Sequence, residues 1–460
     1  MDFCLPEWRS SAHRLLRQLC ETVDRVVPIP PKIPVHAVSS FPNHAKGATM
    51  IDVLNSDTSS PIQKLHELQV IIKIAERCNL ACSYCYYFFM GDDSYKGRDP
   101  IMKPDKFSAV ADYIKRGVED LGIRNVNIVF HGGEPTLMRA RDFRGLVSAL
   151  RETLTPICGL SLGIQTNGYH LTAEWEDLIS EFSISVGISL DGPAEYNDRF
   201  RVTHKGKGSH EKIARTVGRL HELEAERKIS AIGVLSVLGR DIPIEETFDH
   251  FVEELKFRHM GFLLPDRSHD EPFVDGETPD EYGDLLIGLF NKWLSHQDIS
   301  VREVTKVIRY FQEYAPARAA ATDVFDKRTH VVVIQSTGEV SCDDSLIPAL
   351  EWRSSQRSYS IFGSSLYSFV NDPGLVVLDR ARANLPDDCF NCRWVRICGG
   401  GALENRFSRT RQFDNPSVYC AGLKKYYSHV VDFLIENGYP EAAIQERLKA
   451  DEVMQPTFAI

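Results

Sequence analysis

The stretch Arg77-Cys-Asn-Leu-Ala-Cys-Ser-Tyr-Cys-Tyr86 contains three cysteines, Cys78, Cys82 and Cys85, separated by three and then two residues. It follows directly after the apolar run 70–75, which predicts a strand that ends shortly before the first thiol. A [4Fe–4S] cluster is normally held by four thiolates, so three closely spaced cysteines would leave one iron open to another ligand. Two other interpretations stay open at this point: a zinc site, which needs a fourth Cys or His nearby, and a chance group of buried thiols.

The composition is that of an ordinary globular protein. The chain has 460 residues, 43% hydrophobic and 25% charged, which predicts about two to three domains, or one large barrel with a smaller module. A net charge of −11 argues against a nucleic-acid partner, and no apolar run reaches about 18 residues, so we expect no membrane span. The first 20 residues lack the apolar core of a secretory signal, so the expected location is the cytoplasm. In that reducing compartment most of the 11 cysteines are expected to bind metal, whereas Cys4, Cys20 and Cys158 are predicted to be small buried apolar residues.

Short apolar runs alternate with amphipathic stretches between residues 68 and 296. The predicted strands are 70–75, 126–130, 160–165, 184–190, 230–237 and 259–264. The predicted helices are 104–121, 140–154, 173–182, 209–224, 243–255 and 279–296. Six strand–helix units predict a parallel sheet with right-handed crossovers, either doubly wound or curled into a partial barrel. In a barrel the functional loops follow the carboxyl ends of the strands.

Further motifs follow the next predicted strands. Phe130-His-Gly-Gly-Glu-Pro135 comes after the second strand, where two glycines let the backbone approach a ligand and a glutamate can accept a hydrogen bond from an ammonium group. Gln165-Thr-Asn-Gly168 follows the third strand, and Ser189-Leu-Asp-Gly-Pro193 follows the fourth, before Asn197-Asp-Arg-Phe-Arg201. Each of these is also an ordinary turn sequence when taken alone. Their common place at strand ends predicts a single site.

The three cysteines on a loop after a strand resemble the radical SAM family, in which the open iron takes the amino and carboxylate groups of S-adenosylmethionine (SAM). The resemblance implies that Gly132, Gly133 and Glu134 contact the methionine amino group. Ser189 lies where polar contacts to the cofactor are expected. Arg201 matches the family arginine that pairs with the SAM carboxylate, a task that suits a bidentate guanidinium.

The later motifs narrow the resemblance to peptide- and protein-modifying maturases. In those sequences a His-Asp-x-x-Arg element follows Ser-Leu-Asp-Gly-Pro, and here Asn197 replaces the histidine. Asp191 is expected either to position the substrate or loop, or only to form an Asp-Gly-Pro turn. The aromatic residues beside the first cysteines are expected to pack in the core rather than to stack on a substrate, namely Tyr84, Tyr86, Tyr87 and Phe88.

A second group of cysteines lies near the C-terminus: Cys389, Cys392, Cys398 and Cys420. With the glycine run 399–401, these residues resemble the SPASM extension of radical SAM peptide maturases. Four thiolates would close a second cluster without an open iron, which suits electron transfer. Structural zinc on four cysteines is the alternative.

The chain departs from a complete SPASM module, which holds two auxiliary clusters. Ala402 stands where that module has a cysteine, and Cys342 has no candidate partner between itself and Cys158. We therefore expect the first auxiliary cluster to be lost and Cys342 to be a lone thiol. In sulfatase maturases the residue that matches Asp343 acts as a general base, so we expect Asp343, with Asp344 as second candidate, to deprotonate the substrate. A solvated loop carboxylate is the other interpretation.

The resemblance implies that a 5′-deoxyadenosyl radical abstracts hydrogen from a precursor peptide, with a flavodoxin- or ferredoxin-type protein as external electron donor. The single auxiliary site and the segment 68–78, which ends at the first cysteine, look like those of three-residue cyclophane-forming enzymes. The expected reaction therefore joins an aromatic ring to the β-carbon of a nearby residue. The alternatives are a formylglycine-generating sulfatase-type maturase, and a thioether-forming or epimerising peptide maturase. The alternative from another functional class is a protein without catalytic activity, either an iron–sulfur electron carrier or a scaffold stabilised by zinc.

The predicted fold is α/β, a partial (β/α)6 TIM-like radical SAM barrel with a C-terminal SPASM-like iron–sulfur domain. Precursor-peptide recognition domains occur in related maturases, but the N-terminal segment is shorter than a complete one and is expected to be a packing arm. The expected segments are an N-terminal helix and proline-rich strap (1–66), the radical SAM partial barrel (67–300), a helical bridge (301–335), the SPASM-like domain (336–425) and C-terminal helices (426–460).

Overall fold

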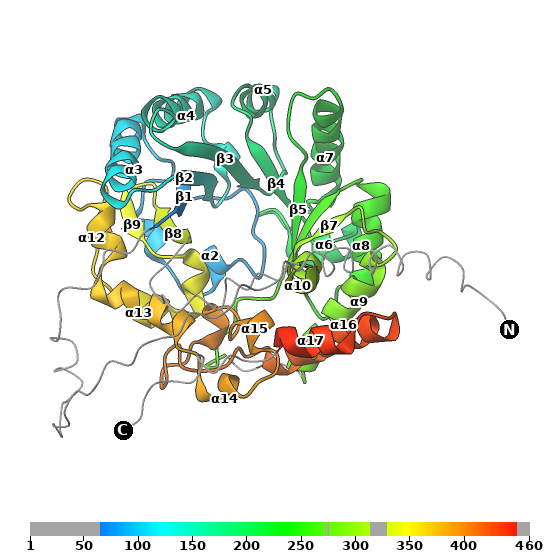
Figure 1. Ribbon diagram of the computed structural model, residues 1–460. Helices are drawn as coiled ribbons and strands as arrows, with labels where there is room; N and C mark the ends of the chain where they lie inside the picture. Colours follow the sequence, from blue (N-terminus) through cyan, green and yellow to red (C-terminus); the bar gives the residue numbers. More distant parts are fainter. Residues whose placement is uncertain (1–64, 272, 274–275, 313–328, 449–460) are drawn as a thin grey trace, which may run out of the picture.

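The computed structural model describes residues 65–271, 273, 276–312 and 329–448 (Figure 1). The predicted N-terminal helix and strap, with Cys4 and Cys20, lie outside the described residues. Among the described helices, none combines the length and the apolar character that crossing a bilayer requires.

The described strands form one sheet in the order β10-β9-β8-β1-β2-β3-β4-β5-β6-β7. Strands β1 to β7 pair in parallel with their sequence neighbours, and β8 pairs in parallel with the other edge of β1. The parallel strands are β1 (Glu67–Ala75), β2 (Asn125–Gly132), β3 (Gly159–Thr166), β4 (Ser185–Ser189), β5 (Gly233–Val237), β6 (His259–Leu263), β7 (Ser300–Val301) and β8 (Thr329–Ile334). Figure 1 shows the sheet curving, with α3, α4, α5 and α7 on its outer side.

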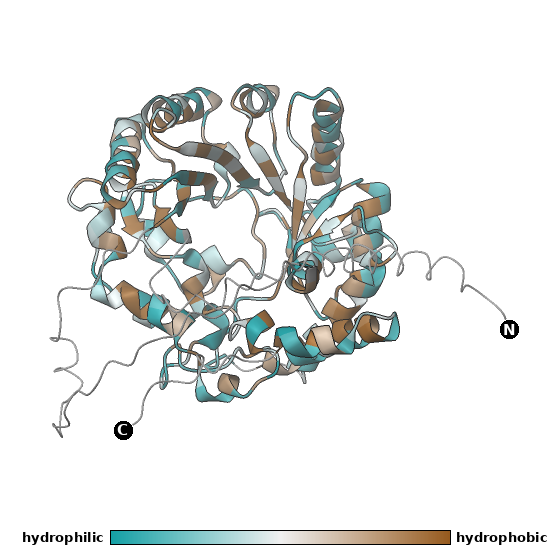
Figure 2. Cartoon of the chain, viewed as in Figure 1, coloured by the Kyte–Doolittle hydropathy of each residue, from teal (hydrophilic) through white to brown (hydrophobic). Residues whose placement is uncertain are grey.

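The helices between these strands follow the predicted pattern. They are α3 (Phe107–Leu121), α4 (Ala140–Leu154), α5 (Ala173–Glu181), α6 (Ala194–Phe200), α7 (His210–Ala225), α8 (Ile244–Asp249) with a π-turn at His250–Glu254, and α9 (Pro279–Trp293). In α3 the buried residues Val110, Ile114 and Val118 recur every four positions, so one apolar stripe faces the sheet. Gly122 ends this helix at φ 65°, a left-handed conformation that glycine adopts without strain. Figure 2 shows largely apolar central strands and hydrophilic residues on the outer helices.

The predicted helical bridge is correct only in its first part. Helix α10 spans Arg302–Gln312, but the end of that segment is strand β8, whose residues pair with β1 from Glu67↔Thr329 to Ile72↔Ile334. The run Val331-Val-Val-Ile334 is β-branched, and such residues favour a strand packed beside other strands. The six predicted barrel strands are therefore present, and the sheet is extended by β7 at one edge and by β8 at the other.

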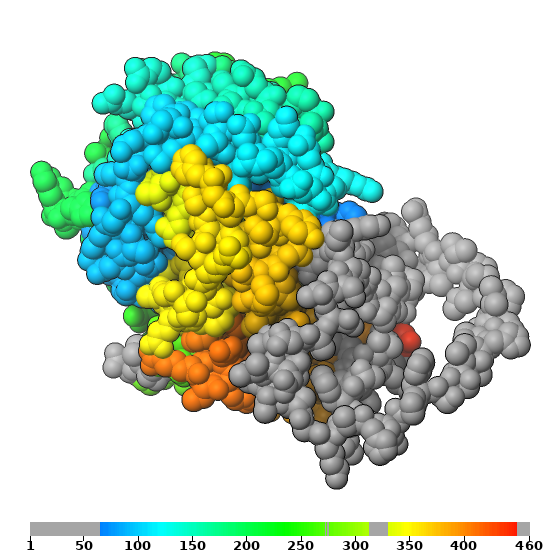
Figure 3. Space-filling view, turned by 90° about the vertical axis from the view of Figure 1, so that its left-hand side faces the viewer, coloured from blue at the N-terminus to red at the C-terminus, as the bar shows by residue number. Residues whose placement is uncertain are grey.

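The C-terminal part packs directly on the barrel. Its main elements are β9 (Glu339–Ser341), α11 (Leu350–Ser354), β10 (Tyr359–Ser360), α12 (Leu366–Val370), α13 (Pro373–Ala383), α14 (Asp387–Phe390), α15 (Val395–Cys398), α16 (Cys420–Glu436) and α17 (Glu441–Leu448). Helix α16 lies so close to α9 that a Cβ on Gly422 would stand 2.0 Å from the carbonyl oxygen of Pro279. A Cβ on Gly117 of α3 would likewise stand 2.3 Å from Leu366 of α12. Figure 3 shows the same close packing from the side, with the yellow segment seated against the blue and cyan helices.

Candidate active site

The three N-terminal cysteines lie together on the loop after β1. The sulfur of Cys78 accepts hydrogen bonds from the amide of Leu80 at 3.4 Å and from the side chain of Asn167 at 3.5 Å. Burial, together with the negative charge of Glu134 and the neighbouring thiols of Cys82 and Cys85, raises the pKa of Cys78 to about 12. Since close thiolates repel one another and lose hydration, this group needs a cation to ionise it. An iron–sulfur cluster supplies that positive charge.

The segment after α6 fixes the conformation of this loop. The amides of Ala81 and Ser83 donate to the carbonyl oxygens of Val202 at 2.7 Å and Phe200 at 3.0 Å. The ring of His204 contacts the carbonyl oxygen of Cys78 at 2.9 Å. The loop is therefore held in place by the protein itself, as a site for a cluster with only three protein ligands requires.

The Gly-Gly-Glu-Pro element packs against the same loop, and this packing explains its glycines. A Cβ on Gly132 would lie 2.0 Å from the carbonyl oxygen of Ala75, and one on Gly133 would lie 2.3 Å from that of Arg77. The amide of Gly133 donates to Ala75 at 2.7 Å. In the described residues both glycines thus serve a close approach between two backbone segments at the strand ends.

Glu134 joins the second and third motifs. Its buried carboxylate accepts hydrogen bonds from the hydroxyl of Thr136 at 2.6 Å, the hydroxyl of Thr166 at 2.7 Å and the amide of Asn167 at 2.8 Å. Burial raises the pKa of Glu134, and these hydrogen bonds oppose the shift. The side chain is therefore an anchor between the ends of β2 and β3, in addition to the cofactor contact that its motif implies.

Arg201 is buried and held by Asp191. The guanidinium Nε donates to Asp191 Oδ2 at 2.7 Å, and the amide of Val237 donates to Asp191 Oδ1 at 3.0 Å. The two Nη groups of Arg201 make no hydrogen bond to the described residues, so a carboxylate could still bind them in a bidentate way. Arg201 also lowers the pKa of Cys82, against the larger effect of burial, which places its charge beside the cysteine loop. Asp191 is thus a buried positioning residue as well as part of a turn.

The two remaining polar residues of these motifs have different surroundings. Ser189, at the end of β4, accepts a hydrogen bond from Gln165 at 2.8 Å and is partly accessible. Asn197 is fully buried and binds Asp198 at 2.8 Å and Ser209 at 3.1 Å. Where the related maturases have a histidine, this chain therefore has a residue that holds the loop after α6.

The three tyrosines beside Cys85 are buried (Tyr87) or partly buried (Tyr84 and Tyr86), and each bonds to a carboxylate. Tyr84 donates to Asp191, Tyr87 donates to Glu76, and Tyr86 donates to Asp344 at 2.8 Å. They pack as predicted, and they also tie the cysteine loop to strand ends on both sides. The sequence analysis did not identify these carboxylate partners, because the two members of each pair are separated by between 11 and 258 residues.

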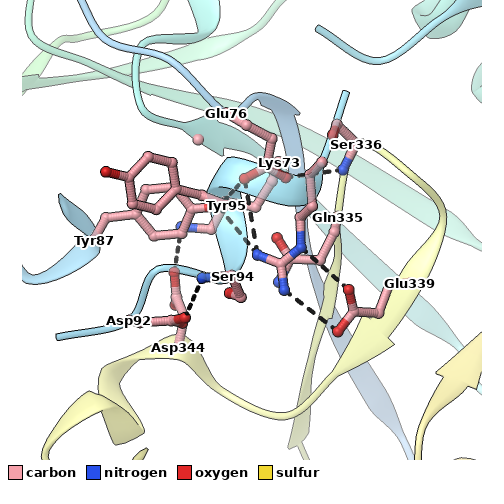
Figure 4. A network of polar contacts seen from close by, with 12 residues as sticks. Lys73, Glu76, Tyr87, Asp92, Ser94, Tyr95, Gln335, Ser336, Glu339 and Asp344 are labelled. Carbon is pink, nitrogen blue, oxygen red and sulfur yellow. Dashed lines mark hydrogen bonds and ion pairs between the residues drawn. The ribbon is translucent and has the colours of Figure 1, made fainter. Parts of the chain in front are cut away.

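Lys73 is a buried residue of β1 that the sequence analysis missed. Its ammonium group forms an ion pair with Asp344, contacts the hydroxyl of Tyr86 at 3.1 Å and lies 4.5 Å from the centroid of the Tyr87 ring. Figure 4 shows this network joining β1 and the cysteine loop to the β8–β9 hairpin. In the same network the amide of Ser336 donates to Glu76 at 3.1 Å.

The pKa values of the two candidate bases are shifted in opposite directions. Although burial opposes ionisation, Lys73 holds the pKa of Asp344 well below its ordinary value. Burial and the adjacent Asp344 instead raise the pKa of Asp343, whose side chain accepts a hydrogen bond from the amide of Ser345 at 3.1 Å. Nearby, burial raises the pKa of Asp266 to about 8 and that of Glu404 to about 7. Asp343 is the better proton acceptor of the adjacent pair.

The four C-terminal cysteines line one cavity. Cys389 lies in α14, Cys398 ends α15 and Cys420 begins α16, while Cys392 lies between the first two helices. The cavity is otherwise mainly apolar, with Trp394, Val395, Leu423 and Tyr427 in its wall.

The glycine run after Cys398 shapes this cavity. Gly399, Gly400 and Gly401 have φ angles of 62°, 83° and 84°, which disfavour any residue with a Cβ. The following Ala402 is exposed and does not line the cavity. Cys342, beyond β9, is buried, and burial raises its pKa to about 11. Cys158 is only half-buried, so it is less enclosed than predicted.

Both cysteine groups fit clusters better than single ions. Within the described ranges, no three or more His, Cys, Asp or Glu side chains are arranged to hold one metal ion. A zinc ion needs its sulfur ligands about 2.3 Å from one point. A cluster has its irons at separate corners, so its thiolates stand around a larger volume. Four sulfur donors around a cavity match that second arrangement.

Comparison with known proteins agrees with this chemistry. Residues 72–255 match the model of the Radical SAM superfamily. A serine-type anaerobic sulfatase-maturating enzyme from Bacteroides thetaiotaomicron is 25% identical over 412 residues, which covers 83% of this chain and 93% of that protein. A cysteine-type counterpart from Clostridium novyi is 24% identical over 79% of this chain and 95% of its own length. An uncharacterized protein from Methanothermobacter thermautotrophicus is 30% identical over 49% of this chain and 79% of that protein.

Two solved structures share the fold. Native anSMEcpe with bound AdoMet and the Cp18Cys peptide has a TM-score of 0.66 at 20% identity, covering 83% of this chain and 100% of that one. SuiB from Streptococcus suis, bound to its precursor peptide SuiA, has a TM-score of 0.51 at 17% identity, covering 74% and 72%. The chain therefore belongs to the radical SAM superfamily and is an enzyme of its SPASM maturase type.

Proposed function

We propose that this enzyme modifies a ribosomally made precursor peptide by joining an aromatic ring to the β-carbon of a nearby residue, which forms a cyclophane. The observation that carries the proposal is the single four-cysteine cavity beside the barrel. Within the described residues, Ala402 is exposed and Cys342 belongs to no second such group. This single-auxiliary arrangement resembles that of the cyclophane-forming maturases.

The two cysteine groups have separate roles in this proposal. Cys78, Cys82 and Cys85 hold the [4Fe–4S] cluster with the open iron, and the second group, Cys389, Cys392, Cys398 and Cys420, holds one auxiliary [4Fe–4S] cluster. When bound, the first cluster and SAM supply the 5′-deoxyadenosyl radical that removes a hydrogen atom from the peptide, and the auxiliary cluster supplies a sink for one electron.

The residues around the first cysteine group orient SAM. Gly132 and Gly133 present backbone toward its amino group, and the free Nη groups of Arg201 receive its carboxylate. Asp191 holds Arg201 in place through an ion pair with Nε, which leaves the two Nη groups for the SAM carboxylate. Ser189 offers a partly accessible hydroxyl at the end of β4. Glu134 keeps the two glycines aligned through its hydrogen bonds to β3.

Asp343 accepts the proton that ring substitution releases. Forming a bond at an aromatic carbon requires that carbon to lose a proton and the ring to lose an electron. A carboxylate with a raised pKa is a better base than an ordinary one, and Asp343 has that property. Lys73 prevents Asp344 from competing, because it stabilises the Asp344 carboxylate as an anion. The two carboxylates therefore have different functions despite being adjacent.

Two partners follow from this chemistry. The substrate is a precursor peptide that places an aromatic residue and its crosslinking partner in the barrel. The electron that starts each turnover comes from an external donor of the flavodoxin or ferredoxin type.

A sulfatase-type activity is the second candidate. It is favoured by the sequence similarity to sulfatase-maturating enzymes over about four-fifths of this chain. In that case the substrate would be a Cys or Ser residue that is oxidised to formylglycine. The presence of only one four-cysteine cavity among the described residues weighs against this candidate, because those relatives carry all seven SPASM cysteines.

Mass spectrometry of a coexpressed peptide distinguishes the candidates. We expect a coexpressed precursor peptide to lose two hydrogens and to resist proteolysis at the joined residues. Formylglycine formation would instead convert a Cys thiol or a Ser hydroxyl into an aldehyde, and because the Ser reaction also removes two hydrogens, capture by a hydrazide reagent identifies it. Epimerisation would leave the mass unchanged. A modified peptide with an unchanged mass, or one that carries an aldehyde, would overturn the cyclophane proposal.

A further inference from the structure

Arg406 is a buried arginine beside the auxiliary cavity. It ends the short helical turn Glu404–Arg406 and is 1% exposed. Gly400, which lines the cavity, lies so close that a Cβ there would stand 3.3 Å from Arg406 Nη1. The guanidinium therefore packs directly against a glycine of the cavity wall.

Two of its three nitrogen groups are fixed by backbone carbonyls. Nε donates to Asn415 at 3.0 Å, and Nη1 donates to Ala381 at 2.8 Å. Asn415 is itself buried and returns a hydrogen bond to the carbonyl oxygen of Arg406 at 2.8 Å. The remaining nitrogen, Nη2, is buried without a hydrogen-bond partner in the described part of the chain.

The charge of this guanidinium is also uncompensated. No carboxylate of the described residues forms an ion pair with Arg406. An arginine side chain stays protonated in proteins, and a buried charge without a partner is strongly unfavourable. The groups whose negative charge acts on it are Cys389, Asp414 and Cys398, the two cysteines in their thiolate form. Both thiolates line the cavity.

We propose that Arg406 is the buried counterion of the auxiliary cluster and raises its reduction potential. A cluster held by four thiolates is an anion, and reduction adds one more negative charge. A fixed positive charge therefore stabilises the reduced form more than the oxidised form. The consequence is a cluster that accepts an electron more readily, as removal of an electron from the substrate ring requires. This inference rests on the proposed assignment of the auxiliary cluster to the four cysteines.

Redox titration followed by electron paramagnetic resonance tests the proposal. The full-length chain with Cys78, Cys82 and Cys85 all changed to alanine serves as the background, so that only the auxiliary cluster gives a signal. In this background we expect Arg406→Gln to lower the ratio of reduced to oxidised cluster about tenfold at a fixed potential, which corresponds to a shift of about 59 mV. Arg406→Lys, which keeps a positive charge, should restore most of that loss.

Arg409→Gln is the matched control. Arg409 lies three residues further along, is exposed and pairs with Glu351, so its removal should leave the potential unchanged. If Arg406→Gln loses iron altogether, an Arg406→Lys protein that keeps its iron and its potential still supports the charge requirement. An unchanged potential in Arg406→Gln, or an Arg406→Lys protein that behaves no better than Arg406→Gln, would overturn the proposal. Absence of a second cluster in the unsubstituted protein would instead refute the cluster assignment itself.

Discussion

The two cysteine groups offer the same ligand atoms, but their surroundings differ. The first lies among buried charges, with Arg201 on one side and Lys73 on the other, and its loop is pinned by strand ends. The second lines a mainly apolar cavity, with its cysteines on or between short helices. Charged and hydrogen-bonding groups are needed to orient a zwitterionic ligand such as SAM, whereas an electron site needs only enclosure and a suitable potential. The surroundings thus indicate two different tasks for the same kind of ligand.

Removing one cysteine from each group gives the largest contrast. We expect Cys82→Ala to abolish 5′-deoxyadenosine formation, because the first cluster loses one of its three protein ligands. Cys392→Ala should leave some uncoupled SAM cleavage but no modified peptide. Anaerobic turnover with dithionite, followed by chromatography of 5′-deoxyadenosine, measures both. Equal and intact turnover in the two variants would refute the division of tasks.

The next prediction concerns the buried ion pair between Lys73 and Asp344, which lies near the first cysteine group. Lys73→Met should leave the Asp344 carboxylate buried without a partner and destabilise the fold by about 3–5 kcal/mol. Denaturant unfolding monitored by circular dichroism measures this loss. The double variant Lys73→Met/Asp344→Leu should recover much of the stability, because it removes both charges. A single variant as stable as the unsubstituted protein would show that the pair contributes nothing.

Much of this arrangement was predictable from the sequence, because it depends on local patterns. Strands β1 to β6 and helices such as α4 and α9 follow apolar periodicity, and both cysteine groups are short motifs. The structure brings the thiols of each group together as predicted. Their role as cluster ligands stays a proposal.

What the sequence did not predict depends on distant contacts. By its sequence Lys73 is an ordinary polar residue in a strand, but its partner Asp344 follows the β8–β9 hairpin some 270 residues later, which strand β8 brings beside β1. The same limit applies to β8 itself, which lay in a predicted helical bridge, and to Arg406, whose burial no local pattern signals. The predicted domain boundaries remain predictions, because the contacts between the barrel and the C-terminal part do not define where one domain ends and the next begins.

A smaller effect is expected at the SAM carboxylate. Arg201→Lys keeps a positive charge but loses the planar pair of Nη donors, so SAM affinity should fall by about 10- to 100-fold, or about 1.5–3 kcal/mol. Isothermal titration of the anaerobic enzyme with SAM measures the change. Arg199→Lys, an exposed change on α6, is the control and should bind SAM normally. Equal affinities in both variants would remove Arg201 from the SAM site.

The smallest effect is a pH dependence that separates radical formation from the later proton transfer. The pKa of Asp343 is raised by burial and by the adjacent Asp344, so this base becomes protonated at a higher pH than an ordinary aspartate. A protonated carboxyl group cannot accept a proton, so the yield of modified peptide per 5′-deoxyadenosine should fall as the pH is lowered, approaching about tenfold per pH unit below that pKa. Asp343→Asn should give a low yield at every pH, while 5′-deoxyadenosine formation continues. Glu404, whose pKa burial raises to about 7, is a second carboxyl group that interacts with Asp343, so Glu404→Gln is the matched variant. If Glu404→Gln flattens the profile and Asp343→Asn does not, the base is Glu404, and the substrate's proton leaves through the turn Glu404–Arg406 rather than through Asp343.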